Sequence, residues 1–272
     1  MKTKPLWTQV PNCGPNLTLI DRDYSPAAGA SVWHNCPQLA LLDPYVGWTF
    51  FEDFLDMPCD DTTHNPTAWS YSGIHPSQIT FPISLLSGVI QLDSANTDLD
   101  ETYIQAGHSV TVAPFVITDA SLNPVFFEAR VRMLEIADLG AFIGLAEEGS
   151  AAAGFLTDAT GVLVNKDLIG FNILNASPTA WNFTYKALGQ VVYTQANVVA
   201  NDGATWVRLG FYFDGLHTVR TYINGVLNAT THLTSAATFP TGEEMSPIIA
   251  IKTGEGVLKR IQVDYIKVVQ IR

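Results

Sequence analysis

The sequence predicts an all-β fold, either an antiparallel β-sandwich or a jelly roll. Apolar and polar residues alternate over short runs, turn signals separate these runs, and no segment has the spacing of a long amphipathic helix. Many short strands without long helices are typical of sandwiches and barrels.

The strongest strand patterns lie in the middle of the chain. In Val125–Met133 the odd positions are apolar, while the even positions carry Glu128, Arg130 and Arg132. Trp206–Asp214 alternates in the same way. Because successive side chains of a strand point to opposite faces, each run is expected to bury one face and to expose the other.

A hairpin is predicted where Val219–Ile223 runs into Asn224-Gly225 and continues through Val226-Leu227. A type I′ turn needs positive φ at both central residues, which Asn-Gly tolerates. Further strands are expected at Thr49–Leu55, Ile83–Leu92, Ser109–Ala113, Ala141–Leu145, Leu168–Leu174, Gln190–Thr194, Ile248–Ile251 and Arg260–Ile271.

Residues 1–47 differ from the rest of the chain, and we expect an extended, Pro-rich N-terminal arm followed by a β-domain over residues 48–272. Six prolines interrupt the segment, and only residues 38–42 could form a short helical turn or strand. Its apolar and aromatic residues are too many for a free linker. The arm is therefore expected to lie on a surface, either its own or that of a neighbouring molecule.

The composition is apolar and acidic. Apolar residues make up 47% of the 272 residues and charged residues 15%, the net charge is -12, and the mean hydropathy is +0.16. No stretch reaches the about 18 to 20 apolar residues of a membrane span. The sparse Lys and Arg disfavour nucleic acid as a partner. Either a thick sandwich or a surface covered by other subunits would account for this composition.

The three cysteines, Cys13, Cys36 and Cys59, are odd in number and form no C-x-x-C pair. Complete disulfide pairing within one chain is impossible, which favours reduced thiols and synthesis in the cytoplasm.

Two terminal strand patterns carry a family resemblance. Thr49–Leu55 and Val263–Gln270 resemble the first and last strands of a concanavalin A-like (LamG-like) jelly roll, which lie side by side in that family. Trp206–Gly215 followed by Thr221–Gly225 resembles a hairpin of the same family. Among proteins with this fold, the whole pattern is most similar to the capsid decoration (cement) proteins of tailed bacteriophages.

Motifs for catalysis or cofactor binding are not evident. Glucanases of this fold place Glu-x-Asp-x-x-Glu on one strand, whereas here Glu128 is followed by Arg130 at the matching position. The six histidines have no metal-ligand spacing. We therefore expect no catalytic residues, no cofactor and no enzymatic activity. A calcium site is the alternative to a solvated turn in the acidic loop from Asp93 to Glu101, but no metal is expected.

The resemblance implies a structural protein on the outer surface of a virion, made in the host cytoplasm. Its expected partners are the major capsid protein and other copies of itself in a homo-oligomer, with no membrane contact. Four aromatic residues of the arm and its junction would bury apolar area on these partners: Trp7, Trp33, Tyr45 and Trp48.

The alternative is a carbohydrate-binding, lectin-like module of an adhesin or tail fibre. Sugars stack on exposed aromatic faces, and two pairs could form such platforms: Trp69 with Tyr71, and Trp181 with Tyr185. Alternating aromatic residues on a strand are more often core or interface residues, so exposure of Trp69 and Trp181 would favour the lectin and burial would count against it.

Overall fold

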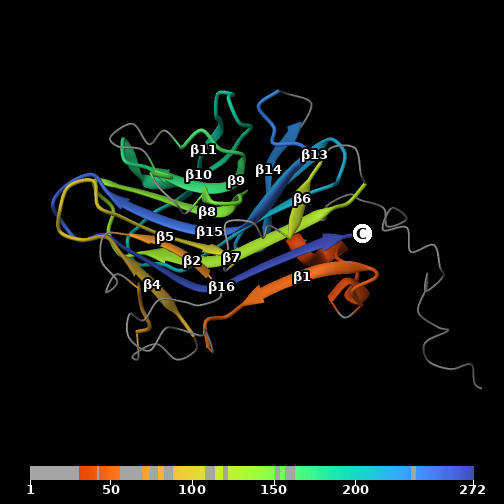
Figure 1. Ribbon diagram of the computed structural model, residues 1–272, viewed down its shortest axis with the longest axis horizontal. Coiled ribbons are helices and arrows are strands. Elements are labelled where there is room, and N and C mark those ends of the chain that lie inside the picture. Colours follow the sequence, from red (N-terminus) through yellow and green to blue (C-terminus); the bar gives the residue numbers. More distant parts are fainter. Residues whose placement is uncertain are drawn as a thin grey trace, which may run out of the picture.

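The computed structural model of the chain describes residues 31–41, 43–55, 69–73, 79–82, 88–107, 114–118, 122–150, 154–156, 163–233 and 237–272. Their strands form two antiparallel sheets, which we call sheet I and sheet II. Figure 1 shows these sheets as two layers of the molecule. The predicted β-sandwich is confirmed.

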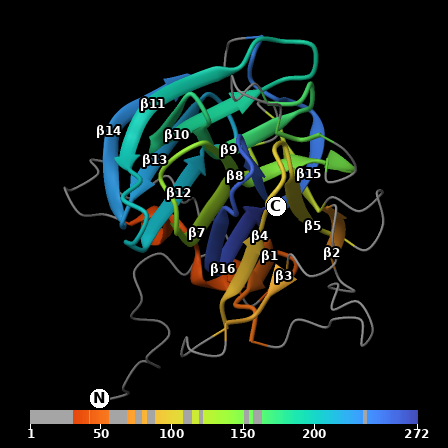
Figure 2. The same cartoon turned by 90° about the vertical axis from the view of Figure 1, so that its left-hand side faces the viewer.

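Sheet I contains the first and the last strand of the fold. Its strand order is β14 (Val226–Leu233), β13 (Thr218–Ile223), β12 (Val207–Phe213), β7 (Val125–Met133), β16 (Arg260–Ile271), β4 (Ile90–Asp93) and β3 (Ile79–Thr80), and β1 (Gly47–Glu52) also pairs with β16. Figures 1 and 2 both show β1 beside β16.

Sheet II covers one face of sheet I. Its strand order is β11 (Tyr193–Ala200), β10 (Ser177–Lys186), β9 (Leu168–Leu174), β8 (Leu139–Glu147), β15 (Glu243–Thr253), β5 (Glu101–Ala106) and β2 (Trp69–Gly73), and β6 (Phe115–Ile117) also pairs with β15.

The core lies between the sheets, where every second side chain of each strand points inward. Phe127 and Phe211 stack within sheet I with ring centroids 5.0 Å apart, and Phe183 from sheet II lies 6.0 Å from Phe211. Since facing aromatic rings bury large apolar areas, this contact fixes how the two sheets pack.

The outer face of sheet I is divided into two halves. One half is apolar, and two 3-10 turns, η2 (Val32–Asn35) and η3 (Gln38–Leu41), lie on it. We call residues 31–41 and 43–46 the covering segment. Its buried Val32 and Ala40 pack with apolar side chains of the sheet: Phe126, Tyr222, Val269 and Ile271. The described part of the predicted arm thus lies on the chain's own domain.

Several predicted elements are confirmed. The strands at residues 125–133 and 168–174 have the predicted bounds, η3 lies where a short turn was expected, and Asn224 and Gly225 have φ of 52° and 79°. The strand predicted at Gln190–Thr194 begins only at Tyr193, and β2, β3, β5, β6 and β10 were missed. Ser109–Ala113 lies outside the described residues, as do residues 83–87. No helix among the described residues is long and apolar enough to span a membrane.

Candidate functional site

The second half of the outer face of sheet I is polar and lies beyond the covering segment. The even positions of β7 place Arg130 and Arg132 there, and Arg208 of β12 lies opposite Arg130 in the strand register. We call this surface the Trp206 face, and define it by Trp206, Arg130, Arg132, Arg208, Gln262, Gln91, Asp93 and Asp264.

Trp206 is the aromatic centre of this face. The guanidinium carbons of Arg130 and Arg132 each lie 4.8 Å from its ring centroid. Both arginines extend from the same face of β7, so the indole lies across their two side chains. The ring is partly exposed. Cation–π contacts of this kind orient an aromatic ring at a surface.

A row of planar polar side chains crosses three strands beside the indole. Arg132 Nε donates to Gln262 Oε1 at 2.6 Å, Gln262 Nε2 donates to Gln91 Oε1 at 2.5 Å, and Gln91 Nε2 donates to Asp93 Oδ1 at 2.8 Å. Burial raises the pKa of Asp93, while the hydrogen bond from Gln91 lowers it. The chain of hydrogen bonds holds each group in one orientation.

A bulge in β16 adds a carboxylate to the face. The register of β16 against β7 shifts between Val263 and Tyr265, and Asp264 reaches Arg130 at 2.5 Å. A bulge re-aims a side chain in this way because one residue falls out of the paired ladder.

The border with the covering segment is also tied by polar contacts. Tyr265 donates its hydroxyl hydrogen to Glu128 Oε1 at 2.7 Å, and burial raises the pKa of Tyr265. Lys267 lies 4.5 Å from the ring centroid of Trp33. The first contact joins β16 to β7 at this border, and the second joins β16 to the covering segment.

Comparison with known proteins gives a likeness in structure only. No family model matches the chain, and no curated protein matches it. Solved structures do resemble it. A non-specific endo-β-1,3(4)-glucanase of family GH16 gives a TM-score of 0.56 at 10% identity, covering 84% of this chain and 93% of that one.

Two other solved structures show the same architecture. The Bacillus licheniformis β-glucanase has a TM-score of 0.53 at 11% identity, over 80% of this chain and 96% of that one. The carbohydrate recognition domain of Emp47p has a TM-score of 0.51 at 11% identity, over 81% and 94%. The chain has a concanavalin A-like jelly-roll fold.

This finding corrects one prediction. The expectation that the chain is not an enzyme is contradicted, because solved glucanases have the same concanavalin A-like fold. The missing motif on one strand is a local observation, whereas a fold can bring catalytic groups together from different strands. At these identities the likeness concerns the fold alone, and the resemblance to phage decoration proteins remains a prediction.

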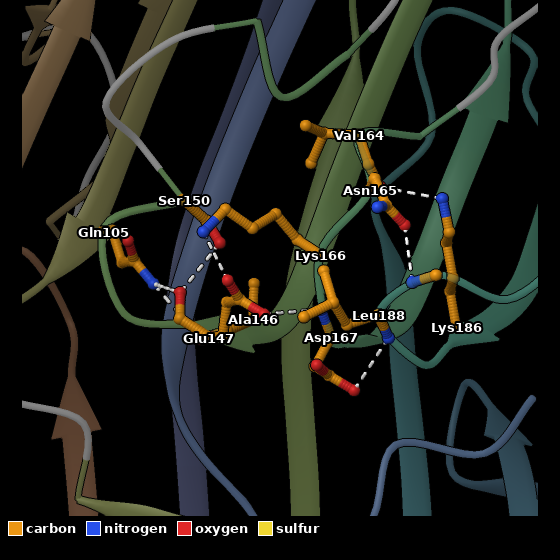
Figure 3. A network of polar contacts seen from close by, with 11 residues as sticks. Gln105, Ala146, Glu147, Ser150, Val164, Asn165, Lys166, Asp167, Lys186 and Leu188 are labelled. Carbon is orange, nitrogen blue, oxygen red and sulfur yellow. Dashed lines mark hydrogen bonds and ion pairs between the residues drawn. The ribbon is translucent and has the colours of Figure 1, made fainter.

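Two carboxylates do lie together at one end of sheet II. Glu147 ends β8 and Asp167 precedes β9, and burial together with the nearby Glu147 carboxylate raises the pKa of Asp167 to about 6. Figure 3 shows the surrounding network. Glu147 pairs with Lys166 and accepts a hydrogen bond from the Asp167 amide at 2.9 Å, and Asp167 accepts one from the Leu188 amide at 3.2 Å.

The network of Figure 3 ties the β8–β9 connection to the residues after β10. Lys186 donates to the Val164 carbonyl at 3.1 Å, and Gln105 donates to the Glu147 carbonyl at 2.8 Å. Burial lowers the pKa of Lys186. Since backbone groups and Lys166 bind the carboxylate oxygens, this pair joins the end of β8 to the residues directly before β9.

The predicted sugar-stacking platforms lie in the core. Trp69 is 3% exposed and Trp181 1%, while Tyr185 is buried and Tyr71 is half-buried against core side chains. The aromatic residues do alternate along their strands, but their rings point toward the opposite sheet. These four residues therefore cannot form the exposed platform that the lectin hypothesis required of them.

The predicted partner-binding aromatics differ in their exposure. Trp33 stacks on Phe126 of the same chain at 6.2 Å, whereas Tyr45 is 90% exposed and Trp48 44%. Trp7 lies outside the described residues. Of the three that the structure describes, Tyr45 and Trp48 are thus exposed and Trp33 is half-buried.

Trp48 also borders a cavity of about 310 Å³ at the end of the sandwich. Gln270 of β16 bridges the two sheets there, because its side chain accepts from the Val116 amide at 3.1 Å and donates to the Val116 carbonyl at 2.5 Å. The Arg272 guanidinium lies 5.8 Å from the Trp48 ring.

Sequence reasoning missed the Trp206 face as a site. The alternation in β7 did place Arg130 and Arg132 on the surface side. The contact with Trp206 and the row through Gln262 and Gln91 depend on strand order and register, which the local sequence does not contain.

Proposed function

We propose that this chain binds carbohydrate on the Trp206 face. The observation that carries the proposal is a partly exposed indole held by two guanidinium groups beside a row of planar hydrogen-bonding side chains. The lectin hypothesis is thereby kept, while its residues change.

The chemistry of this surface suits a sugar. The C–H face of a pyranose packs on an indole, and its hydroxyl groups pair with carboxamides, carboxylates and guanidinium groups. Gln91 and Asp93 are half-buried and are held in place by each other and by the buried Gln262, so a sugar that contacts them would cost little side-chain entropy.

The similar structures support this proposal. The solved proteins that share the fold include glucanases and a carbohydrate recognition domain. The fold thus supports carbohydrate-handling surfaces in other proteins, although function depends on the site.

Titration against a panel of polysaccharides tests the function, and Trp206→Ala tests the site. We expect Trp206→Ala to weaken binding by at least about 10-fold, which corresponds to about 1.4 kcal/mol. Trp48→Ala is the matched control, because Trp48 is also a partly exposed tryptophan beside an arginine. Absence of binding to any polysaccharide would refute the function, and equal losses in both variants would refute the site.

A second candidate is contact with a protein assembly such as a phage capsid. Three exposed aromatic residues lie at and next to β1, Tyr45, Trp48 and Phe51, and they favour it, since exposed apolar surface marks interaction sites. Substituting Tyr45 and Phe51 by Ser should abolish binding to assembled particles in co-sedimentation. Unchanged co-sedimentation would remove β1 as that surface.

A further inference from the structure

Arginine is concentrated on the Trp206 face. The chain has seven arginines, at positions 22, 130, 132, 208, 220, 260 and 272. Arg130, Arg132 and Arg208 belong to the face, and Arg260 lies at its edge opposite Asp93 in the register of β16 and β4. In a chain of net charge -12 this is an unusual local concentration of positive groups.

Two of these four guanidinium groups are neutralised locally. Arg130 pairs with Asp264 at 2.5 Å, and Arg260 pairs with Glu135 at 2.7 Å. Because each is paired with a carboxylate, these two arginines add little net charge to the surface, although they help to fix the positions of neighbouring side chains.

The other two have no acidic partner in the described part of the chain. Arg132 donates to the neutral Gln262 side chain, and Arg208 Nη2 donates to the Asn224 carbonyl at 2.8 Å. A guanidinium group has five N–H donors, so each of these arginines retains donors for a ligand. Arg208 is exposed and Arg132 is half-buried.

Arg132 and Arg208 lie near enough to reach a single bound group. Their guanidinium groups contact opposite neighbours, Gln262 of β16 and the Asn224 carbonyl, so both side chains would turn to bind it. Arg208 is paired with Arg130 in the register, and Arg132 is two residues further along β7 on the same face. Diagonal neighbours of this kind lie about 7 to 8 Å apart, a distance that two long side chains can span together. Trp206 lies two residues before Arg208 and contacts Arg132, so the indole flanks the pair.

We propose that the carbohydrate bound here is acidic, with a carboxylate or sulfate held between Arg132 and Arg208 while a neighbouring sugar ring packs on Trp206. This inference rests on the proposed carbohydrate-binding function and narrows its ligand class. Charge-assisted bonds to guanidinium groups are among the stronger hydrogen bonds in proteins, and their forked donors fit planar or tetrahedral oxyanions.

The face suits an acidic sugar better than a nucleic acid. Nucleic acid binding depends on many phosphate contacts along a basic surface. Here only two unpaired guanidinium groups are available, and the acidic groups Asp264, Glu135 and Asp93 lie close by. The general negative charge repels a polyanion at long range, but in salt of about 0.15 M it is screened beyond about 8 Å.

Titration with pairs of polymers that share one backbone tests the proposal. Dextran sulfate is compared with dextran, and polygalacturonate with its methyl ester, so that sulfate and carboxylate are examined separately. We expect the charged member of at least one pair to bind at least about 10-fold more tightly, and to weaken as salt is raised.

The variant Arg132→Gln/Arg208→Gln should remove this preference, because it should weaken binding of the charged polymer at least about 10-fold more than binding of its neutral partner. Arg272→Gln, paired with Trp48 at the other end of the sandwich, is the control for charge and should change nothing. A preference that survives the double substitution would overturn the inference.

The remaining outcomes separate this inference from the function on which it rests. Equal binding of charged and neutral polymers, weakened by Trp206→Ala, would refute the acidic ligand and keep the carbohydrate site. Binding to duplex DNA as tight as to the acidic polymers would overturn both. Absence of binding to any of the polymers would also overturn both.

Discussion

Two glycines face each other in the middle of sheet II. Gly144 of β8 and Gly170 of β9 are paired in the register, and a Cβ on either would lie 2.6 Å from the Cα of the other. The tip of the Phe142 ring lies about as close to each position. Phe142 therefore occupies the space that two side chains would fill, and its ring packs on Phe155 at 5.1 Å.

Gly144→Ala should destabilise the protein by about 1 to 3 kcal/mol, because the added methyl group meets backbone atoms that cannot move aside. Gly140→Ala on the same strand is the control, since a Cβ there meets only ordinary contacts at 3.8 and 3.9 Å. Its free energy of unfolding should change by less than about 1 kcal/mol. Urea denaturation measures both, and equal effects would contradict this account.

At the scale of single residues, the sequence predicts the geometry of a turn better than it predicts which side chains form a surface site. Asn224-Gly225 predicts its own geometry, because few residues accept positive φ. Trp181 and Tyr185 alternate on β10 in a pattern that fits both an exposed platform and a core. Which of the two occurs depends on where the second sheet lies, and no local pattern contains that information.

Among the elements, the covering segment has the most direct influence on the surface. It buries Val32 and Ala40 against sheet I, and the Trp33 ring stacks on Phe126. Burial also raises the pKa of its Cys36 thiol to about 11. Part of the apolar composition that suggested a covered surface is thus covered by the chain itself.

A chain beginning at residue 31 should be more stable than one beginning at residue 47. Loss of the covering segment exposes the apolar half of the face, and the burial of Val32 and Trp33 alone contributes about 3 kcal/mol. The melting temperature should differ by about 6 to 12 °C. Calorimetry compares the two chains, and identical melting temperatures would show that the segment does not stabilise the sheet.

The strand order illustrates what could be predicted at this scale. The pairing of the first strand with the last was expected from family resemblance and is confirmed by β1 and β16. The short strands β2, β5 and β6 lacked enough alternating residues to be recognised. They exist because β15 provides a long paired edge for β5 and β6, and β5 in turn pairs with β2.

In the molecule as a whole, the pKa values of two buried groups are shifted in opposite directions within the same pH range. His232 accepts from the Tyr193 hydroxyl at 3.1 Å and donates Nε2–H to Gln195 Oε1 at 2.8 Å, and burial lowers its pKa to about 4. Asp167 has its pKa raised to about 6. Between pH 6 and 4, the unfolded chain protonates the histidine first, whereas the folded chain protonates Asp167 first.

These opposite pKa shifts predict how the stability of two variants changes relative to that of the wild type as the pH falls from 6 to 4. His232→Gln should gain stability relative to wild type, and Asp167→Asn should lose it. Neither difference can exceed about 1.4 kcal/mol per pH unit. Urea denaturation midpoints between pH 4.5 and 7.5 measure both differences, and parallel curves for all three proteins would contradict the assignment.

The place of β16 in sheet I has a consequence for synthesis of the chain. This strand follows all the others in the sequence, yet it pairs with β7, β4 and β1. Until the residues of β16 leave the ribosome, no strand joins β1 and β4 to β7. The edge of β7 that later pairs with β16 also stays unpaired. Long-range pairing of this kind folds slowly and leaves strands exposed to aggregation. We therefore expect the nascent protein to be most prone to association before Arg260–Ile271 is available.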